Sequence, residues 1–301
     1  MGTSNRAALL TKTHKALKKH YTPVTPADRP LLSQLLFALC LENSTYEAAE
    51  KVMAELENGF FDLNEVRVST VTELAELMTA LRDAKQQAAN VKRSLQSIFE
   101  STYSFDLEPL KKKNLGQAVK DLEKLPGVTR FAVAVVTQTS LGGHSIPLDR
   151  GALASLFVLG IATEKEAESG TVPGVERAIP KNKGVEFGSL LHQLGVELLA
   201  KPHSNEVRDI FTSIAPDAKE RLPKRGAKKP APAPVAKAEA KEEKPVVASG
   251  KPAPSAAKKV KGKSKAETPT KKPAAKKSDG KAKKAGDKPS GSKRLAKSKP
   301  R

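Results

Sequence analysis

Residues Leu125–Asp149 read LPGVTRFAVAVVTQTSLGGHSIPLD and are the most informative part of this chain. A helical segment leads into it, and Pro126 and Gly127 then make the chain turn sharply. The apolar run that begins at Phe131 predicts a second, buried helix, although its β-branched residues alone would also permit a strand. The sequence therefore predicts two helices joined by a tight turn, followed by a lone carboxylate at Asp149.

Segments with apolar residues at helical spacing lie on both sides of this stretch. We expect helices over residues 5–20, 31–41, 45–56, 70–80, 85–100, 114–124, 131–140, 152–159 and 185–199. Residues 170–184 contain Val-Pro-Gly-Val, which imitates the hairpin turn, but we interpret them as a polar loop because no apolar helix follows the turn. Nothing in the first 125 residues predicts a strand, so the expected fold class is all-α.

The positive charge of the chain is concentrated at one end. Residues 219–301 contain 28 Lys and Arg against 7 Asp and Glu, whereas residues 1–218 contain 25 against 26. The C-terminal segment also has 11 of the 21 prolines and no aromatic residue, so it has too little apolar surface to offset the entropy of ordering. We therefore expect a folded domain over residues 1–217 and a disordered Lys/Ala/Pro-rich tail over residues 218–301. Such a tail binds nucleic acid without sequence preference and in a salt-sensitive manner; a solubilising polycation is the alternative.

The hairpin stretch resembles the helix-hairpin-helix and aspartate signature of the endonuclease III-like DNA glycosylase superfamily. Members of that family typically have Leu-Pro-Gly-Val-Gly-Arg and, further along, Val-Asp or Leu-Asp; this chain has Leu-Pro-Gly-Val-Thr-Arg and Leu148-Asp149. As a looser pattern, the resemblance covers roughly residues 5–205. It implies a two-lobed helical DNA glycosylase-like domain that binds double-stranded DNA. The tail is similar to those of linker histones and bacterial nucleoid proteins.

Three positions depart from the family. Thr129 replaces the second hairpin glycine, and Phe131 occupies the position of the Schiff-base lysine of bifunctional members. Cys40 stands where relatives place a glutamine that fills the gap left by a flipped base. Because a phenyl ring cannot attack a sugar carbon, the resemblance implies that any activity is monofunctional base removal without lyase cleavage of the strand.

The resemblance also implies a phosphate site at the hairpin. In the family, the turn presents backbone N–H groups at a helix N-terminus, where unpaired donors and the helix dipole favour an anion. The hydroxyl of Thr129 could donate to the phosphate or cap the following helix, and an ordinary turn between two helices is the alternative interpretation of the motif. The residues that we expect to contact DNA are Leu125, Pro126, Gly127, Val128, Thr129, Arg130, Lys120, Lys124 and Arg150.

Asp149 is the candidate catalytic residue. In the family, a carboxylate at this place stabilises the cationic sugar and activates a water molecule after the damaged nucleotide has been flipped out of the duplex. The alternative is that Asp149 only caps the helix that begins near Gly151. Arg150 could hold Asp149 in an ion pair, which lowers the pKa of the carboxyl group, or could contact a phosphate.

No cofactor is expected. An iron-sulfur cluster requires four cysteines, and the chain has one. The five histidines have no spacing typical of a metal site, so we expect surface or core roles for them. No apolar run approaches the length of a membrane span and the N-terminus lacks a signal-peptide core, so we expect an intracellular, DNA-associated protein in the cytoplasm, nucleoid or nucleus.

Two functions remain open at this point. The chain is either a monofunctional base-excision enzyme that uses Asp149, or a degenerate relative that binds or architecturally organises DNA without breaking a bond. A structural helical protein with a solubility tail is a third, weaker interpretation. The sequence leaves the lesion and the oligomeric state undetermined.

Overall fold

Every regular element of residues 3–224, the range that this computed structural model describes, is helical. The predicted all-α class is therefore confirmed, and the segment expected over residues 131–140 is a helix, Arg130–Thr139, rather than a strand. The elements are α1 (Thr3–His20), α2 (Leu31–Leu41), α3 (Tyr46–Gly59), α4 (Leu63–Val68), α5 (Val71–Leu77), α6 (Ala84–Thr102), the 3₁₀ helix η1 (Glu108–Lys112), α7 (Leu115–Glu123), α8 (Arg130–Thr139), α9 (Arg150–Val158), α10 (Glu164–Ser169), α11 (Val175–Ala178), α12 (Lys181–Ala200), α13 (Asn205–Ile214) and α14 (Ala218–Arg221).

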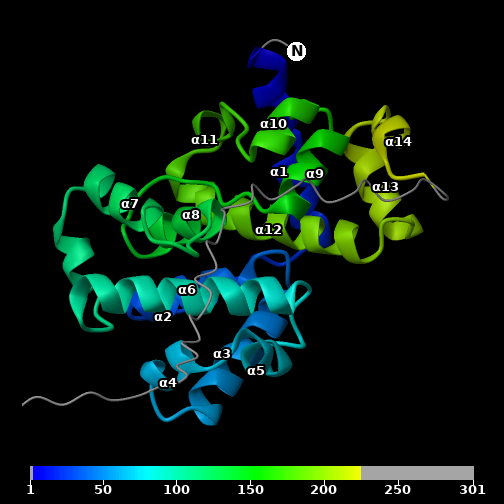
Figure 1. Cartoon of the computed structure of the whole chain (residues 1–301). Helices are drawn as coiled ribbons and strands as arrows, with labels where there is room; N and C mark the ends of the chain where they lie inside the picture. Colours follow the sequence, from blue (N-terminus) through cyan, green and yellow to red (C-terminus); the bar gives the residue numbers. More distant parts are fainter. Residues whose placement is uncertain (1–2, 225–301) are drawn as a thin grey trace, which may run out of the picture. The chain divides into compact units, whose positions relative to one another are not determined.

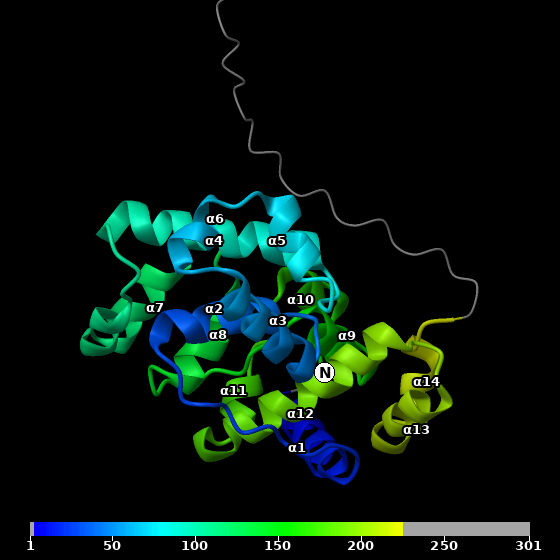
Figure 2. The same cartoon turned by 90° about the horizontal axis from the view of Figure 1, so that it is seen from below.

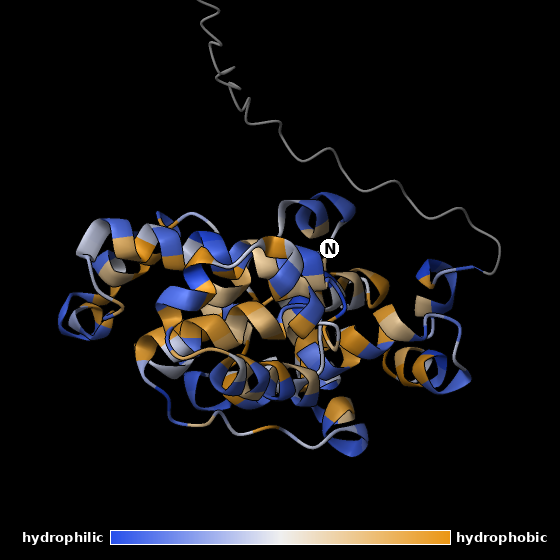
Figure 3. Ribbon diagram, turned by 60° about the horizontal axis from the view of Figure 1, so that its bottom comes forward, coloured by the Kyte–Doolittle hydropathy of each residue, from blue (hydrophilic) through white to orange (hydrophobic). Residues whose placement is uncertain are grey.

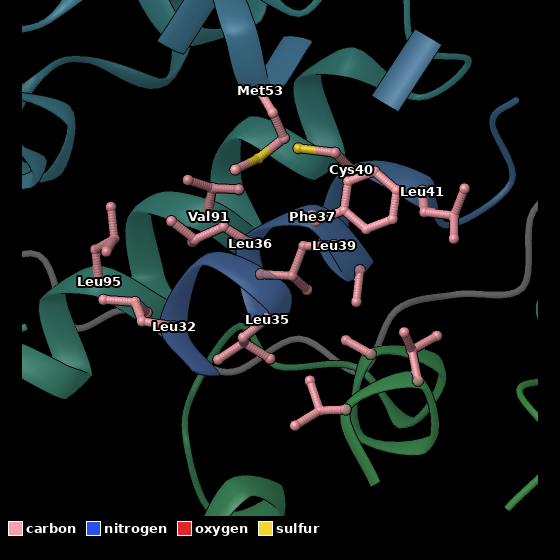
Figure 4. Close-up of a cluster of buried hydrophobic side chains, with 14 of the residues drawn as sticks. Leu32, Leu35, Leu36, Phe37, Leu39, Cys40, Leu41, Met53, Val91 and Leu95 are labelled. Atoms are coloured by element: carbon pink, nitrogen blue, oxygen red, sulfur yellow. The ribbon is translucent and has the colours of Figure 1, made fainter. Parts of the chain in front are cut away.

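The helices form two lobes, each with its own apolar core. The first lobe contains α2 to α8, and α2 is its central helix because ten of its eleven residues are buried. This helix contacts α3, α6 and α8. Cys40 lies next to Met53 inside the same core (Figure 4).

The second lobe combines the two ends of the described chain. Its core contains residues of α1 together with residues of α9 and of the helices that follow it. Figure 1 shows α1 in dark blue in the upper half of the view, with α9, α12 and α13. Helix α1 contacts α11, α12 and α13, and Figure 2 shows it beside α12, which follows it by about 160 residues. Apolar residues gather where the helices face one another, whereas polar residues cover the outer surfaces (Figure 3).

A pair of glycines sets the position of α9 on α12. A Cβ on Gly151 would lie 2.5 Å from the backbone carbon of Gly195, and a Cβ on Gly195 would lie 2.4 Å from that of Gly151. The two backbones therefore pack without intervening side chains. This close approach brings Asp149, directly before α9, beside His192, about one turn before Gly195 on α12.

The structure corrects two expectations about element boundaries. Residues 170–184 are not one continuous loop, because they contain α11 and the first turn of α12. Buried Ala218 and Leu222 pack in the second lobe, so the folded region continues beyond the boundary expected after residue 217. The rest of the expected tail lies outside the described residues.

Sequence periodicity also missed the helices α4, α10, α13 and α14 and the 3₁₀ helix η1. The first two are only six residues long, too short for a helical repeat to be recognised. Within residues 3–224, no helix is both long and apolar enough to cross a membrane.

Candidate nucleic-acid interface and the Asp149 cluster

The predicted hairpin turn joins α7 to α8. Thr129 is the N-cap of α8, and its Oγ1 accepts a hydrogen bond from the backbone N–H of Ala132 at 3.1 Å. Within residues 3–224, no hydrogen bond is donated by the backbone N–H of Gly127, Thr129 or Arg130. Three N–H groups at one end of a ten-residue helix are therefore available to an anion.

The inner face of the turn packs on α6. Gly127 has a φ of +91°, and a Cβ at this position would lie 2.5 Å from the carbonyl oxygen of Asn90 and 2.9 Å from the backbone nitrogen of Ser94. Pro126 and Arg130, on the other side, are exposed. Helix α6 therefore covers the inner face of the turn, and only the outer face is accessible.

Replacing Gly127 with alanine should destabilise the protein by about 2–4 kcal/mol, because the new Cβ adds a steric conflict with α6 to the strain of a positive φ. Urea denaturation of the full chain measures this. Gly174→Ala is the matched control, since Gly174 has a φ of +90° and an added Cβ there meets nothing within 4 Å. Equal losses for the two variants would show that the contact with α6 contributes nothing.

The structure places the predicted cationic residues at two locations. Lys120 and Lys124 are exposed on α7, where Lys124 lies 3.7 Å from Asp121. The guanidinium of Arg130 donates to the carbonyl of Ser169 at 2.9 Å. Arg150 belongs to the second lobe. Lys120, Lys124 and Arg130 lie around the hairpin, and the four residues do not meet in a single pocket.

Asp149 is the N-cap of α9, and its side chain is fully buried. Its Oδ1 accepts from the backbone N–H of Ala152 at 2.7 Å, and its Oδ2 accepts from that of Asn43 at 3.1 Å. Oδ2 also lies 3.0 Å from Nδ1 of His192. Burial alone would raise the pKa of Asp149, but the hydrogen bond and charge of His192 and the two backbone donors together lower it. The residue is a charged carboxylate whose oxygens are already occupied by donors of the same chain.

Asn43 connects the start of α9 to the end of α2 through two hydrogen bonds. Its side-chain oxygen accepts from the backbone N–H of Arg150 at 3.1 Å, while its own N–H donates to Asp149. Asn43 has a φ of +61°, a left-handed conformation that asparagine tolerates better than most residues just after a helix. The Asp149 carboxylate thus connects the two lobes.

His192 is the partner of Asp149 and is also buried. Its Nε2 lies 2.8 Å from the carbonyl oxygen of Ser44, and its Nδ1 faces the Asp149 carboxylate. Phe131 stacks on this ring at a centroid distance of 5.7 Å, and Tyr46 meets it edge-on at 5.3 Å. Phe131 and His192 therefore fill the space beside the carboxylate.

A small cavity remains on the other side of His192. It has a volume of about 40 Å³, and its lining includes Phe37, Tyr46, Phe131 and His192 but not Asp149. A water molecule takes up about 30 Å³ in the liquid, so this cavity is too small for a nucleobase. No cavity large enough for a nucleobase lies in front of the Asp149 carboxylate.

Arg150 does not pair with Asp149, contrary to one of the two roles expected for it. Its guanidinium lies 3.2 Å from Asp83. Cys40, in turn, is fully buried in the first lobe, where burial raises the pKa of its thiol to about 12. Cys40 therefore does not face DNA, and the residue that meets the gap of a flipped base in the family has no counterpart at this position.

Sequence reasoning missed the residues that surround Asp149. Asn43 and Ser44 lie in the turn that follows α2, whereas His192 lies inside α12, far from them in the chain. A usable signal existed only for Asn43, which directly follows an apolar helical run and so suggested a helix C-terminus. His192 was expected only as one of several core or surface histidines.

Comparison with known proteins supports the fold. No protein-family model matches the chain, and no curated protein matches its sequence. Among solved structures, a non-covalent endonuclease III–DNA complex has a TM-score of 0.50 at 18% identity, over 73% of this chain and 98% of that one. A trapped covalent endonuclease III–DNA intermediate (TM-score 0.49, 16% identity, 73% of this chain and 99% of that one) and a thermostable thymine-DNA glycosylase (0.49, 13%, 72% and 98%) are similar as well. The described chain therefore has an all-helical helix-hairpin-helix DNA glycosylase-like fold, as the sequence resemblance implied.

Proposed function

We propose that this chain is a DNA-binding protein built on the DNA glycosylase fold and that it does not itself remove bases. The observation that carries this proposal is the state of Asp149, whose side chain is fully buried and whose two oxygens accept from Ala152 and Asn43 and pair with His192. A catalytic carboxylate must reach the sugar or the attacking water molecule. Asp149 has neither a free oxygen nor an open cavity in front of it.

The residue beside Asp149 supports the same conclusion. Phe131 is buried and stacks on His192, so the position that bears the lysine in bifunctional relatives contributes apolar packing instead. A buried aromatic pair stabilises the fold through its contact area. Phe131 and Tyr46 thus pack on the buried His192 ring beside Asp149.

DNA binding itself would involve two parts of the chain. The hairpin offers the unpaired N–H groups of Gly127, Thr129 and Arg130, with Lys120 and Lys124 nearby on the surface. Residues 225–301 add 25 Lys and Arg against 6 Asp and Glu. The hairpin would fix the position of the domain on a phosphate, and the basic segment would supply most of the attraction.

The catalytic question has a direct test. Incubation of the full chain with duplexes that contain oxidised, alkylated or mismatched bases should release no base, even at an excess of protein over DNA. Asp149→Asn, which retains a capping oxygen, should behave like the native protein in this assay. Base release by the native chain that Asp149→Asn abolishes would establish the alternative, a monofunctional glycosylase.

The affinity for DNA is measured on the same samples as base release. We expect the native chain to bind undamaged and damaged duplexes with similar affinity, because a closed cleft cannot select a flipped base. A strong preference for one lesion would contradict this proposal even if no base were released.

A further inference from the structure

An exposed phenylalanine lies in the turn between α3 and α4. The side chain of Phe61 is 93% exposed, whereas the preceding Phe60, the C-cap residue of α3, is half-buried. A single apolar residue on the surface is ordinary and needs no partner. Phe61 is therefore informative only through the groups that surround it.

The turn holds Phe61 in a defined conformation. Asp62 is the N-cap of α4, and its Oδ1 accepts from the backbone N–H groups of Asn64 and Glu65 at 2.9 Å. In return, Oε2 of Glu65 accepts from the backbone N–H of Phe61 at 2.7 Å. The local structure therefore presents the phenyl ring to solvent from a backbone that these hydrogen bonds fix.

A pocket opens beside Phe61, between α2, α3 and α4. Its volume is about 270 Å³. Phe61 lines it together with six further apolar side chains, Leu36, Met53, Leu56, Phe60, Leu63 and Val66. An engineered apolar cavity of about 150 Å³ binds benzene, so this pocket has room for an aliphatic or aromatic side chain.

Three carboxylates border this apolar pocket. Glu57 and Asp62 line it, and Glu65 belongs to the first turn of α4. All three are exposed, and none has a salt-bridge partner within residues 3–224. Residues 55–65 contain four Asp and Glu and no Lys or Arg. The pocket, Phe61 and the three carboxylates are called the Phe61 surface below.

The charge of the Phe61 surface selects among possible occupants. Uncompensated carboxylates repel the phosphates of DNA, and Figure 1 shows α4 at the bottom of the view, apart from α7 and α8, which carry the hairpin. A second copy in a symmetric contact would bring the same carboxylates against one another. A basic amphipathic protein segment, in contrast, complements both the apolar pocket and the negative charge around it.

We propose that the Phe61 surface binds a segment of another protein in which apolar anchor residues are flanked by lysine or arginine. One anchor enters the pocket, and a second anchor on the same face of the segment packs on the Phe61 ring. The basic side chains face Glu57, Asp62 and Glu65. This inference depends neither on the hairpin nor on DNA binding.

A synthetic peptide tests the proposal. The probe is a fluorescein-labelled helical peptide of about 16 residues that has leucines at i, i+4 spacing on one face and lysines on the other. Fluorescence anisotropy measures its binding to the full chain. We expect saturable binding that is at least about tenfold weaker for Phe61→Ser, because that variant loses a central aromatic contact. The native ring is exposed, so the substitution should leave the fold intact, and circular dichroism checks this.

Matched variants separate the aromatic contact from the charge. Tyr103→Ser is the control for Phe61→Ser and should keep the native affinity, because Tyr103 is 82% exposed but does not line the pocket. Glu57→Gln should weaken binding by about two- to fivefold at low salt and less at high salt. Glu47→Gln, which changes an exposed carboxylate at the other end of α3, should have no effect.

Changes in the peptide complete the test. Glutamines in place of its lysines should weaken binding to the native chain, and serines in place of its leucines should abolish it. Equal affinity of the native chain and Phe61→Ser would overturn the proposal, as would the absence of peptide binding at concentrations up to about 1 mM.

The remaining outcomes concern other occupants. A dimer of the native chain in sedimentation velocity that Phe61→Ser dissociates would assign the surface to a second copy and overturn the proposed partner. Weaker binding of Phe61→Ser to duplex DNA would assign the surface to DNA instead. Native affinity of this variant for DNA, together with its loss of peptide binding, is the expected result. Failure of the native chain to bind DNA would overturn the proposed function and leave this inference standing.

Discussion

Removal of residues 225–301 should lower the affinity for duplex DNA by at least about a hundredfold at low salt, and should nearly abolish the dependence of binding on salt. The removed segment has 25 Lys and Arg against 6 Asp and Glu, whereas residues 1–224 have 28 against 27. The remaining domain is nearly neutral and lacks long-range attraction for phosphates. Truncation after Lys224 keeps buried Leu222 and the last described helix, α14, in place.

Salt titration gives the measurement. A protein that contacts about 6–10 phosphates loses about 10³–10⁵ in affinity between 50 and 200 mM salt, whereas one or two hairpin contacts would lose less than about tenfold. The control is a chain in which the order of residues 225–301 is shuffled at constant composition. It should bind like the native protein, because counterion release depends on the number of charges and not on their order in the sequence. A truncated protein with the native salt slope would show that the C-terminal segment is not the source of attraction.

Asp149→Ala should destabilise the protein by about 3–5 kcal/mol, although Asp149 is proposed to have no catalytic role. The substitution removes the carboxylate that lies 3.0 Å from Nδ1 of the buried His192 ring and leaves this polar atom facing an apolar methyl group, which is costly in the interior. It also removes the cap from the N–H of Ala152 and the acceptor from the N–H of Asn43. Urea denaturation at neutral pH measures the loss.

Asp149→Asn separates the contributions, because it keeps a capping oxygen and removes only the charge. Its loss should be smaller, and coupling to a His192→Gln substitution in a double-mutant cycle gives the interaction energy between residues 149 and 192. A loss below about 1 kcal/mol for Asp149→Ala would show that the buried contacts contribute little.

The same pair has a definite pH dependence. The folded protein holds the pKa of Asp149 below its ordinary value of 3.8, so in the folded state the carboxyl group binds protons less readily than in the unfolded chain. Its contribution to stability is therefore complete above that ordinary value and is lost as the pH falls through the lower folded pKa. The stability difference between the native chain and Asp149→Asn should shrink accordingly in acid.

Local sequence patterns determined most of the helices. The nearly continuous apolar run over residues 31–41 predicts a buried helix, and α2 has those bounds, because a helix that is apolar on all sides is buried. The hairpin can be recognised from the sequence because Pro126, Gly127 and Thr129 form a turn and a helix cap. Both features depend only on residues that are close by in the chain. The charge of residues 219–301 is likewise a property of composition.

The tertiary structure alone decided what surrounds Asp149. The sequence left catalysis and capping open, and capping is what the geometry has, with His192 as an added partner. Asn43 and His192 lie 106 and 43 residues from Asp149, so no local pattern could bring them together. Their meeting depends on the close approach of α9 and α12 at Gly151 and Gly195 and on the packing of one lobe against the other. Burial, and with it the charge state and accessibility of a carboxylate, is a property of that packing rather than of the residues beside it in the chain.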